Sequence, residues 1–198
     1  HQLRRMKKAH TAAVLCVGLL AGGCVDFHFG SKETIRGSGQ IQSESREVSD
    51  FDRVWIAGSG SVRIVQGDTE SLTIEADDNL LAHIRSEVSG RRLKIGPHND
   101  VNLRPSRPIK YRLALKNLRD LELAGSLKGE CESIETSELA LRISGSGSIS
   151  VASLNADSLS MRISGSGKCT AAGRAPATDI HISGSGDCLA GDLAARTA

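Results

Sequence analysis

The chain has 198 residues, 39% of them hydrophobic and only 3% aromatic, and its 25 Lys and Arg residues nearly balance 23 Asp and Glu residues. Without residues 1–23, which carry four basic and no acidic side chains, 21 basic residues face the 23 acidic ones. This slightly acidic balance argues against a nucleic-acid binder, which needs clustered Lys and Arg. The remaining residues, about 170, suffice for one domain with its own core.

Residues 1–23 are predicted to be an export signal. Four basic residues precede the apolar segment 11–20, which is too short to span a membrane. The segment Leu19-Leu20-Ala21-Gly22-Gly23-Cys24 resembles the lipobox of bacterial lipoproteins, with Ala21 where leucine is usual. We therefore expect lipidation of Cys24 and a membrane anchor, while plain secretory cleavage stays open. Because Val25 replaces the aspartate associated with inner-membrane retention, the resemblance implies an outer-membrane lipoprotein that faces the periplasm or the cell surface.

Residues 24–46 are polar and contain Gly and Ser, which predicts a tether, and the folded domain is expected at residues 47–198. Alternation of apolar and polar residues predicts strands at 51–56, 61–68, 72–76 and 111–115. A single helical turn is expected within residues 77–84. Residues 87–95 resemble a hairpin about Ser89-Gly90, and residues 96–108, with three prolines, are the expected loop.

A Gly-Ser-Gly phrase recurs at a fixed period in the second half of the chain. Its first glycines stand at 125, 145, 165 and 184, and the same wording opens the domain at residues 56–60. Steps of 20, 20 and 19 residues between strand-like segments predict a repeat fold in which one coil buries its apolar face against the next. We therefore expect an all-β, single-domain parallel β-solenoid, or β-helix.

Aligned repeats give columns of like residues. Two inward columns are predicted, one with Leu121, Leu141, Met161 and Ile180 and one with Leu123, Ile143, Ile163 and Ile182. The glycines between strands are expected to form corners that need positive φ, namely Gly58, Gly60, Gly145, Gly147, Gly165, Gly167, Gly184 and Gly186. An anion cradle made by their amides is the alternative, although neither a helix start nor a Gly-Lys-Ser/Thr motif follows any copy.

Three cysteines lie in the predicted domain, in addition to Cys16 in the signal and Cys24. Cys169 and Cys188 share one column of adjacent repeats, so a disulfide between them and two free thiols remain alternatives. Cys131 is the third cysteine and has no predicted partner. Because no His or Cys spacing matches a zinc signature, we expect no metal site, and no cofactor is predicted.

The order of these phrases resembles the head GIN domain family. The phrases are Phe-Asp-x-Val at residue 51, Ala-Asp-Asp-Asn-Leu-Leu at residue 76, Ser-Gly-Arg-Arg-Leu-Lys-Ile at residue 89 and the repeated Ile-Ser-Gly-Ser-Gly. The resemblance covers residues 48–198. It implies an exported or lipid-anchored bacterial β-solenoid, described as an auto-transporter adhesin and without established catalytic residues. It also implies that the chain is truncated and lacks its last coils, because a further strand and corner would follow Ala198.

The function expected first is a non-enzymatic, lipid-anchored envelope protein with an adhesive or interacting surface. One outward column aligns Arg142, Arg162 and His181, which are candidates to bind an anionic surface glycan; a merely solvated charged face is the alternative. Cross-coil ion pairs of Glu122 with Arg142 and of Lys168 with Asp187 are also expected.

Two other functions remain open. A carbohydrate-active β-helix protein would need convergent carboxylates, yet Asp157, Asp179 and Asp187 fall at different phases of the repeat. An envelope assembly or signalling partner would have the same sequence features. The sequence leaves the oligomeric state undecided.

Overall fold

The computed structural model describes residues 32–194 of the chain. The predicted export signal and Cys24 lie outside the described residues and stay predictions. The described residues form one compact unit. Within the described part, no helix has the length and apolar character that crossing a membrane requires.

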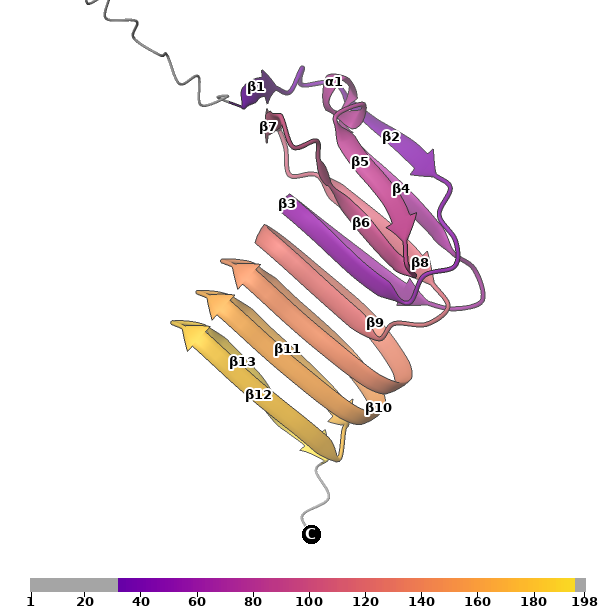
Figure 1. The fold of residues 1–198 in the computed structure, drawn as a ribbon, viewed down its shortest axis with the longest axis vertical. Helices are drawn as coiled ribbons and strands as arrows, with labels where there is room; N and C mark the ends of the chain where they lie inside the picture. Colours follow the sequence, from indigo (N-terminus) through magenta and orange to yellow (C-terminus); the bar gives the residue numbers. More distant parts are fainter. Residues whose placement is uncertain (1–31, 195–198) are drawn as a thin grey trace, which may run out of the picture. The chain divides into compact units, whose positions relative to one another are not determined.

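The described residues are almost entirely strands, which confirms the all-β prediction (Figure 1). One short helix, α1 (Asp78–Leu81), lies among them and confirms the expected helical turn. The strands are β1 (Glu33–Arg36), β2 (Ile41–Arg46), β3 (Arg53–Gln66), β4 (Ser71–Asp77), β5 (Ile84–Ser89), β6 (Arg92–Pro97), β7 (Val101–Arg104), β8 (Lys110–Leu115), β9 (Asp120–Gly145), β10 (Ser148–Gly165), β11 (Lys168–Arg174), β12 (Ala177–Gly184) and β13 (Asp187–Ala194).

The strands of the second half return to the same position every 19 or 20 residues. In the parallel pairs β9–β10 and β10–β12, Leu141 lies beside Met161 and Met161 beside Ile180. The neighbouring inward column behaves in the same way. β3 pairs with the start of β9 and extends both columns, because Val54 lies opposite Leu121. The predicted alignment is therefore confirmed, and the columns are buried except at Ile180 and Ile182, which are 43% and 39% exposed.

One row of parallel segments carries the candidate ligand-binding residues Arg142, Arg162 and His181. It consists of residues 53–58, 120–125, 138–145, 158–165 and 177–184, and we call it row A. The two segments of β9 within it are joined by the hydrogen bond from the Ala140 N–H to the Arg119 carbonyl at 2.8 Å. In Figure 1 these strands lie side by side across the lower half of the unit.

The sheet is mixed and not closed, whereas a parallel fold throughout was predicted. The pairs β2–β4, β4–β8 and β5–β6 are antiparallel. Of these pairs, β5–β6 is antiparallel because a tight turn reverses the chain, whereas β4 lies between β2 and β8 and pairs antiparallel with both across long connections. The β5–β6 turn has positive φ at Gly90 (55°) and Arg91 (61°), as a two-residue hairpin of this kind requires. The predicted centre of the hairpin, Ser89-Gly90, differs from the observed turn by one residue.

The predicted tether is wrong for residues 33–46, which contain β1 and β2. β1 pairs in parallel with β7, inside the segment 96–108 that was expected as a loop, and β2 pairs with β4. Each of these two N-terminal strands contains a single apolar residue, Ile35 and Ile41, so their sequences resemble polar linkers. Their pairing depends on backbone hydrogen bonds to neighbours far along the chain.

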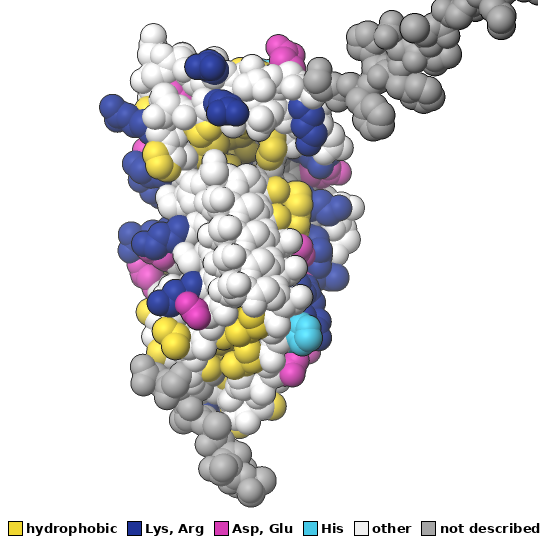
Figure 2. All heavy atoms as spheres, turned by 90° about the vertical axis from the view of Figure 1, so that its left-hand side faces the viewer, with side chains coloured by type: hydrophobic (Ala, Val, Ile, Leu, Met, Phe, Trp, Pro, Cys, Tyr) yellow, Lys and Arg dark blue, Asp and Glu magenta, His cyan; other side chains and the backbone are white. Residues whose placement is uncertain are grey.

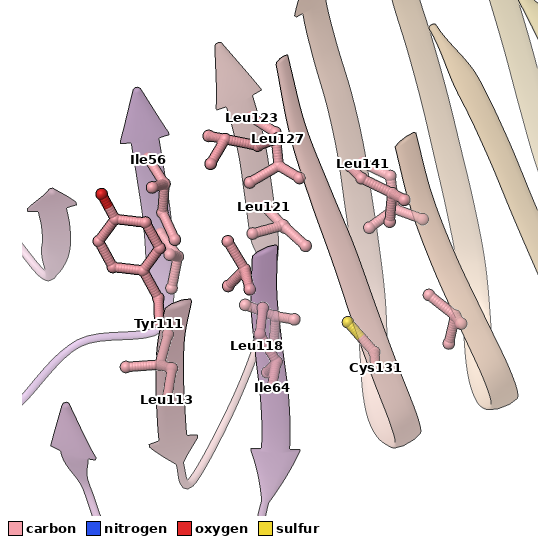
Figure 3. Packing of buried hydrophobic residues seen from close by; sticks show 14 of the residues in the cluster. Ile56, Ile64, Tyr111, Leu113, Leu118, Leu121, Leu123, Leu127, Cys131 and Leu141 are labelled. Atoms are coloured by element: carbon pink, nitrogen blue, oxygen red, sulfur yellow. The ribbon is translucent and has the colours of Figure 1, made fainter. Parts of the chain in front are cut away.

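The core is a continuous cluster of aliphatic side chains. Ile56, Leu121 and Leu141 are at most 1% exposed and project from successive strands of row A into one interior (Figure 3). Tyr111 belongs to this cluster, and burial raises the pKa of its hydroxyl. Burial of a Leu or Ile side chain contributes roughly 1.5–3 kcal/mol, so these columns supply much of the stabilisation.

The corner glycines are required for two different reasons. Gly145 has φ of 124°, as the prediction demands, and positive φ also occurs at Gly58, Gly60, Gly165 and Gly184. Gly147 is not at positive φ, but a Cβ there would lie 2.5 Å from the Leu127 carbonyl oxygen. The same lack of space applies to Gly167 and Gly186, so for these three glycines the predicted reason is corrected.

Candidate functional site

The predicted ligand-facing residues lie together on the outer side of row A. Arg142 is beside Arg162, and Arg162 is beside His181, in consecutive parallel segments. Arg162 and His181 are exposed, whereas the Arg142 side chain is 35% exposed. Figure 2 shows charged side chains on both flanks of an uncharged band on one side of the molecule. The column therefore exists, but its three members are not equivalent.

Arg142 is engaged in an ion pair that the sequence did not suggest. Its Nη1 lies 2.5 Å from Oδ2 of Asp120, which also accepts a hydrogen bond from Arg92 Nη2 at 3.0 Å. The predicted partner Glu122 instead lies 3.9 Å from Arg92. The expected Glu122–Arg142 pair is therefore wrong, because Asp120 presents its carboxylate between the two guanidinium groups.

The second expected ion pair joins Lys168 and Asp187. The two residues are direct neighbours on β11 and β13, as predicted. Among the described residues, however, no ion pair joins Lys168 to Asp187. Lys128 pairs with Glu130 on its own strand at 2.7 Å. Such exposed pairs contribute only about 0–1 kcal/mol, so the difference matters little for stability.

Beside the charged column lies an open hollow of about 810 Å³. It forms because Ala140 and Ser160, which are neighbours on row A, are small, whereas Asp120 precedes them and Asp179 follows them in the same outward line. The lining residues are Arg53, Arg119, Asp120, Glu138, Leu139, Ala140, Ser158, Leu159, Ser160, Pro176, Ala177, Thr178 and Asp179. The hollow thus crosses several consecutive repeats.

Asp120 gives the hollow a polar group that is not fully satisfied. The residue is 8% exposed, and both of its arginine contacts use Oδ2. Its Oδ1 is enclosed and has no hydrogen-bond partner within the described part of the chain. A buried carboxylate oxygen without a donor is costly, roughly 1–3 kcal/mol or more.

The rim of the hollow combines charge with hydroxyl groups. Arg119 and Glu138 form an ion pair across it, and Arg53 donates to the Gly90 carbonyl at 3.1 Å. Ser158, Ser160 and Thr178 add three hydroxyls that both donate and accept hydrogen bonds. Apolar floor residues beside paired charges and hydroxyls suit a polar, uncharged ligand.

The cysteines of the described part are free thiols. Cys169 and Cys188 are register partners on β11 and β13, as the column alignment predicted, and Cys131 lies on β9. Burial raises the pKa of the Cys131 thiol and of the Cys169 thiol to about 12. The pair is therefore brought together, while a bond between them stays a prediction.

Chemistry that needs convergent side chains has little support in residues 32–194. Within this range, no group of three or more His, Cys, Asp or Glu residues is placed to hold a metal ion. Asp157, Asp179 and Asp187 are all exposed and lie on different segments of the repeat.

The sequence prediction missed the residues that shape the hollow. Asp120, Ala140, Ser160 and Asp179 occupy one column of the repeat, two positions before the column of Arg142. The signal was present as two small residues between two carboxylates. The sequence alone does not show that these four positions enclose a hollow, because the hollow depends on how far the neighbouring side chains reach.

A family model described as "Putative auto-transporter adhesin, head GIN domain" matches residues 50–198. None of the curated proteins matches the chain. Among solved structures, a putative lipid binding protein from Parabacteroides distasonis is 24% identical, with a TM-score of 0.67 over 81% of this chain and 78% of that one. A putative adhesin from Parabacteroides merdae is 19% identical, with the same TM-score over 81% and 77% of the two chains.

These comparisons concern the fold and the family of the chain. The solved structures share the fold at low sequence identity. The family match spans most of the chain and agrees with the resemblance in its phrases. The chain therefore belongs to the head GIN domain family.

Proposed function

We propose that this chain is a non-enzymatic, lipid-anchored protein of the outer membrane whose repeats form a parallel β-solenoid with an adhesive face. The family match supports an exported, adhesin-like role. The parallel pairing at steps of 19 and 20 residues supports the solenoid, with the mixed N-terminal sheet acting as its cap. The lipobox-like segment ending at Cys24 supports the anchor.

The hollow on row A is the proposed binding site, and its ligand is an uncharged, hydroxyl-rich surface glycan. The single observation that carries this proposal is the hollow itself, which is lined by the hydroxyls of Ser158, Ser160 and Thr178 and by the exposed carboxylate of Asp179. Sugar hydroxyls donate to carboxylates and exchange hydrogen bonds with serine and threonine hydroxyls. The sugar ring then lies against Ala140 and Ala177.

The test uses three neutral hexasaccharides, cellohexaose, maltohexaose and mannohexaose, in titrations followed by calorimetry. Ala140→Arg fills the hollow with a side chain at an outward position, and it should weaken binding at least tenfold. Ser150→Arg is the matched control, because Ser150 is exposed on β10 and does not line the hollow. If no hexasaccharide binds at millimolar concentration, or if Ala140→Arg binds as the unchanged chain does, the site assignment is wrong.

An anionic glycan at Arg142, Arg162 and His181 is the second candidate. Arg162 and His181 are exposed and adjacent, which favours it. The ion pair of Arg142 with Asp120 reduces the positive charge that this column offers. Polygalacturonate tests this version: binding that persists unchanged after Arg142→Glu and Arg162→Glu together would reject it.

The anchor is tested separately in a Gram-negative host. Mass spectrometry and membrane fractionation of the full chain should show acylation and outer-membrane partitioning, and Cys24→Ala should abolish both. A soluble, unacylated product from the unchanged chain would leave a secreted protein and remove the anchor. This result would not affect the glycan site.

A further inference from the structure

Two thiols face each other on adjacent repeats of the interior. Cys169 and Cys188 are register partners in the parallel pair β11–β13. Paired strands lie about 4.7–4.9 Å apart, and a disulfide accommodates Cα separations of about 4.4–6.8 Å. The Cys188 thiol also lies 3.0 Å from the Met161 sulfur, and Cys188 packs against the core cluster that contains Cys169. The two side chains therefore point into the same space.

The third described thiol is not placed to compete. Cys131 lies opposite Val151 on β10, and Val151 lies opposite Ala171 on β11. Two repeats thus separate Cys131 from Cys188. Burial raises the pKa of Cys131 to about 12, whereas Cys188 is only partly buried and is more accessible to a reagent.

We propose that Cys169 and Cys188 form a disulfide bond by exchange with an organic disulfide. The Cys188 thiolate attacks one sulfur of the oxidant, forming a mixed disulfide and releasing one thiolate. The Cys169 thiolate then attacks the Cys188 sulfur and releases the second. Two protein thiols lose two electrons, the oxidant gains them, and the two protons end on the released thiols.

The bond would join the repeat with the most exposed large apolar side chains to the repeat before it. Ile180, Ile182 and Leu189, on β12 and β13, are 43%, 39% and 55% exposed, unlike the buried residues of the preceding repeats. The register between β11 and β13 also shifts after Thr170. A covalent link from Cys188 to the buried Cys169 would limit separation of β13 from β11. The inference does not depend on the proposed glycan site.

The experiment uses the full chain, first reduced and then incubated with oxidised glutathione. Trypsin cleavage under non-reducing conditions should give peptide 169–174 linked to peptide 175–196, with the mass of two hydrogen atoms lost. Peptide 129–142, which contains Cys131, should retain its thiol. The peptide that contains Cys16 and Cys24 is identified separately by its mass. Oxidation should raise the thermal midpoint by about 5–10 °C, as expected for a loop of this length.

Two variants make the result specific. Cys188→Ser should abolish both the linked peptide and the midpoint shift, whereas Cys131→Ser should keep them. Dithiothreitol should reverse the shift in the unchanged chain. The proposal fails if peptides 169–174 and 175–196 stay unlinked in excess oxidant, or if Cys188 carries only a glutathione adduct.

Discussion

Replacing a corner glycine by alanine tests whether the repeats approach each other as closely as the fold requires. Gly145 has φ of 124°, and a Cβ there would lie 2.6 Å from the Gly125 carbonyl oxygen of the preceding repeat. Gly58 has nearly the same φ, 125°, but a Cβ there would meet no atom within 4 Å. The two positions therefore share the backbone strain and differ in the clash.

The expected magnitudes follow from these two contributions. Alanine at this φ costs about 1–3 kcal/mol, and the reduced entropy of the unfolded chain offsets about 0.4–1 kcal/mol. Forcing a methyl group against backbone adds about 1–3 kcal/mol. We expect Gly58→Ala to lower the free energy of unfolding by roughly 1–2 kcal/mol and Gly145→Ala by roughly 2–5 kcal/mol.

Urea unfolding followed by tryptophan fluorescence measures both variants. The chain has one tryptophan, Trp55, on β3. With a urea slope of about 2 kcal/mol/M, the midpoint of Gly145→Ala should lie roughly 1–2.5 M below that of the unchanged chain. Circular dichroism checks that the transition is global. Equal losses in Gly58→Ala and Gly145→Ala would refute the role of close approach between repeats.

Three further results are expected. Leu141→Ala should lower the free energy of unfolding by about 2–5 kcal/mol, while Ile180→Ala in the same column but 43% exposed should cost less than about 1.5 kcal/mol; equal losses in urea unfolding would contradict the column. Burial raises the pKa of Asp77, but hydrogen bonds led by Ser106 outweigh it and lower the pKa overall. Its contribution is therefore present above the unfolded pKa and is lost as pH falls through the folded pKa, so the stability gap to Asp77→Asn, roughly 1–3 kcal/mol at pH 7, should shrink below about pH 4. Iodoacetamide should label Cys131 only after unfolding, because burial raises the pKa of its thiol to about 12; rapid labelling of the native chain would show that the thiol is exposed.

The repeat sequence by itself determined the all-β class, the inward columns and the family. Alternation of period two placed Leu141 and Ile143 inside, and the constant step between glycines placed like residues in neighbouring segments. These features are repeated several times, so each copy supports the others. They depend on local spacing, which is written directly in the chain.

The tertiary structure decided the mixed sheet, the strands of residues 33–46 and the shape of the hollow. β1 and β2 have too few apolar residues to be predicted as strands from their sequences. Their partners β7 and β4 also lie far along the chain, so no local pattern indicates the pairing. Arg142 was correctly placed on the outer face, but its charge is held by Asp120, a residue 22 positions away that lies diagonally across two segments. Such contacts depend on side-chain reach and on which neighbours are small, and neither follows from the period of the repeat.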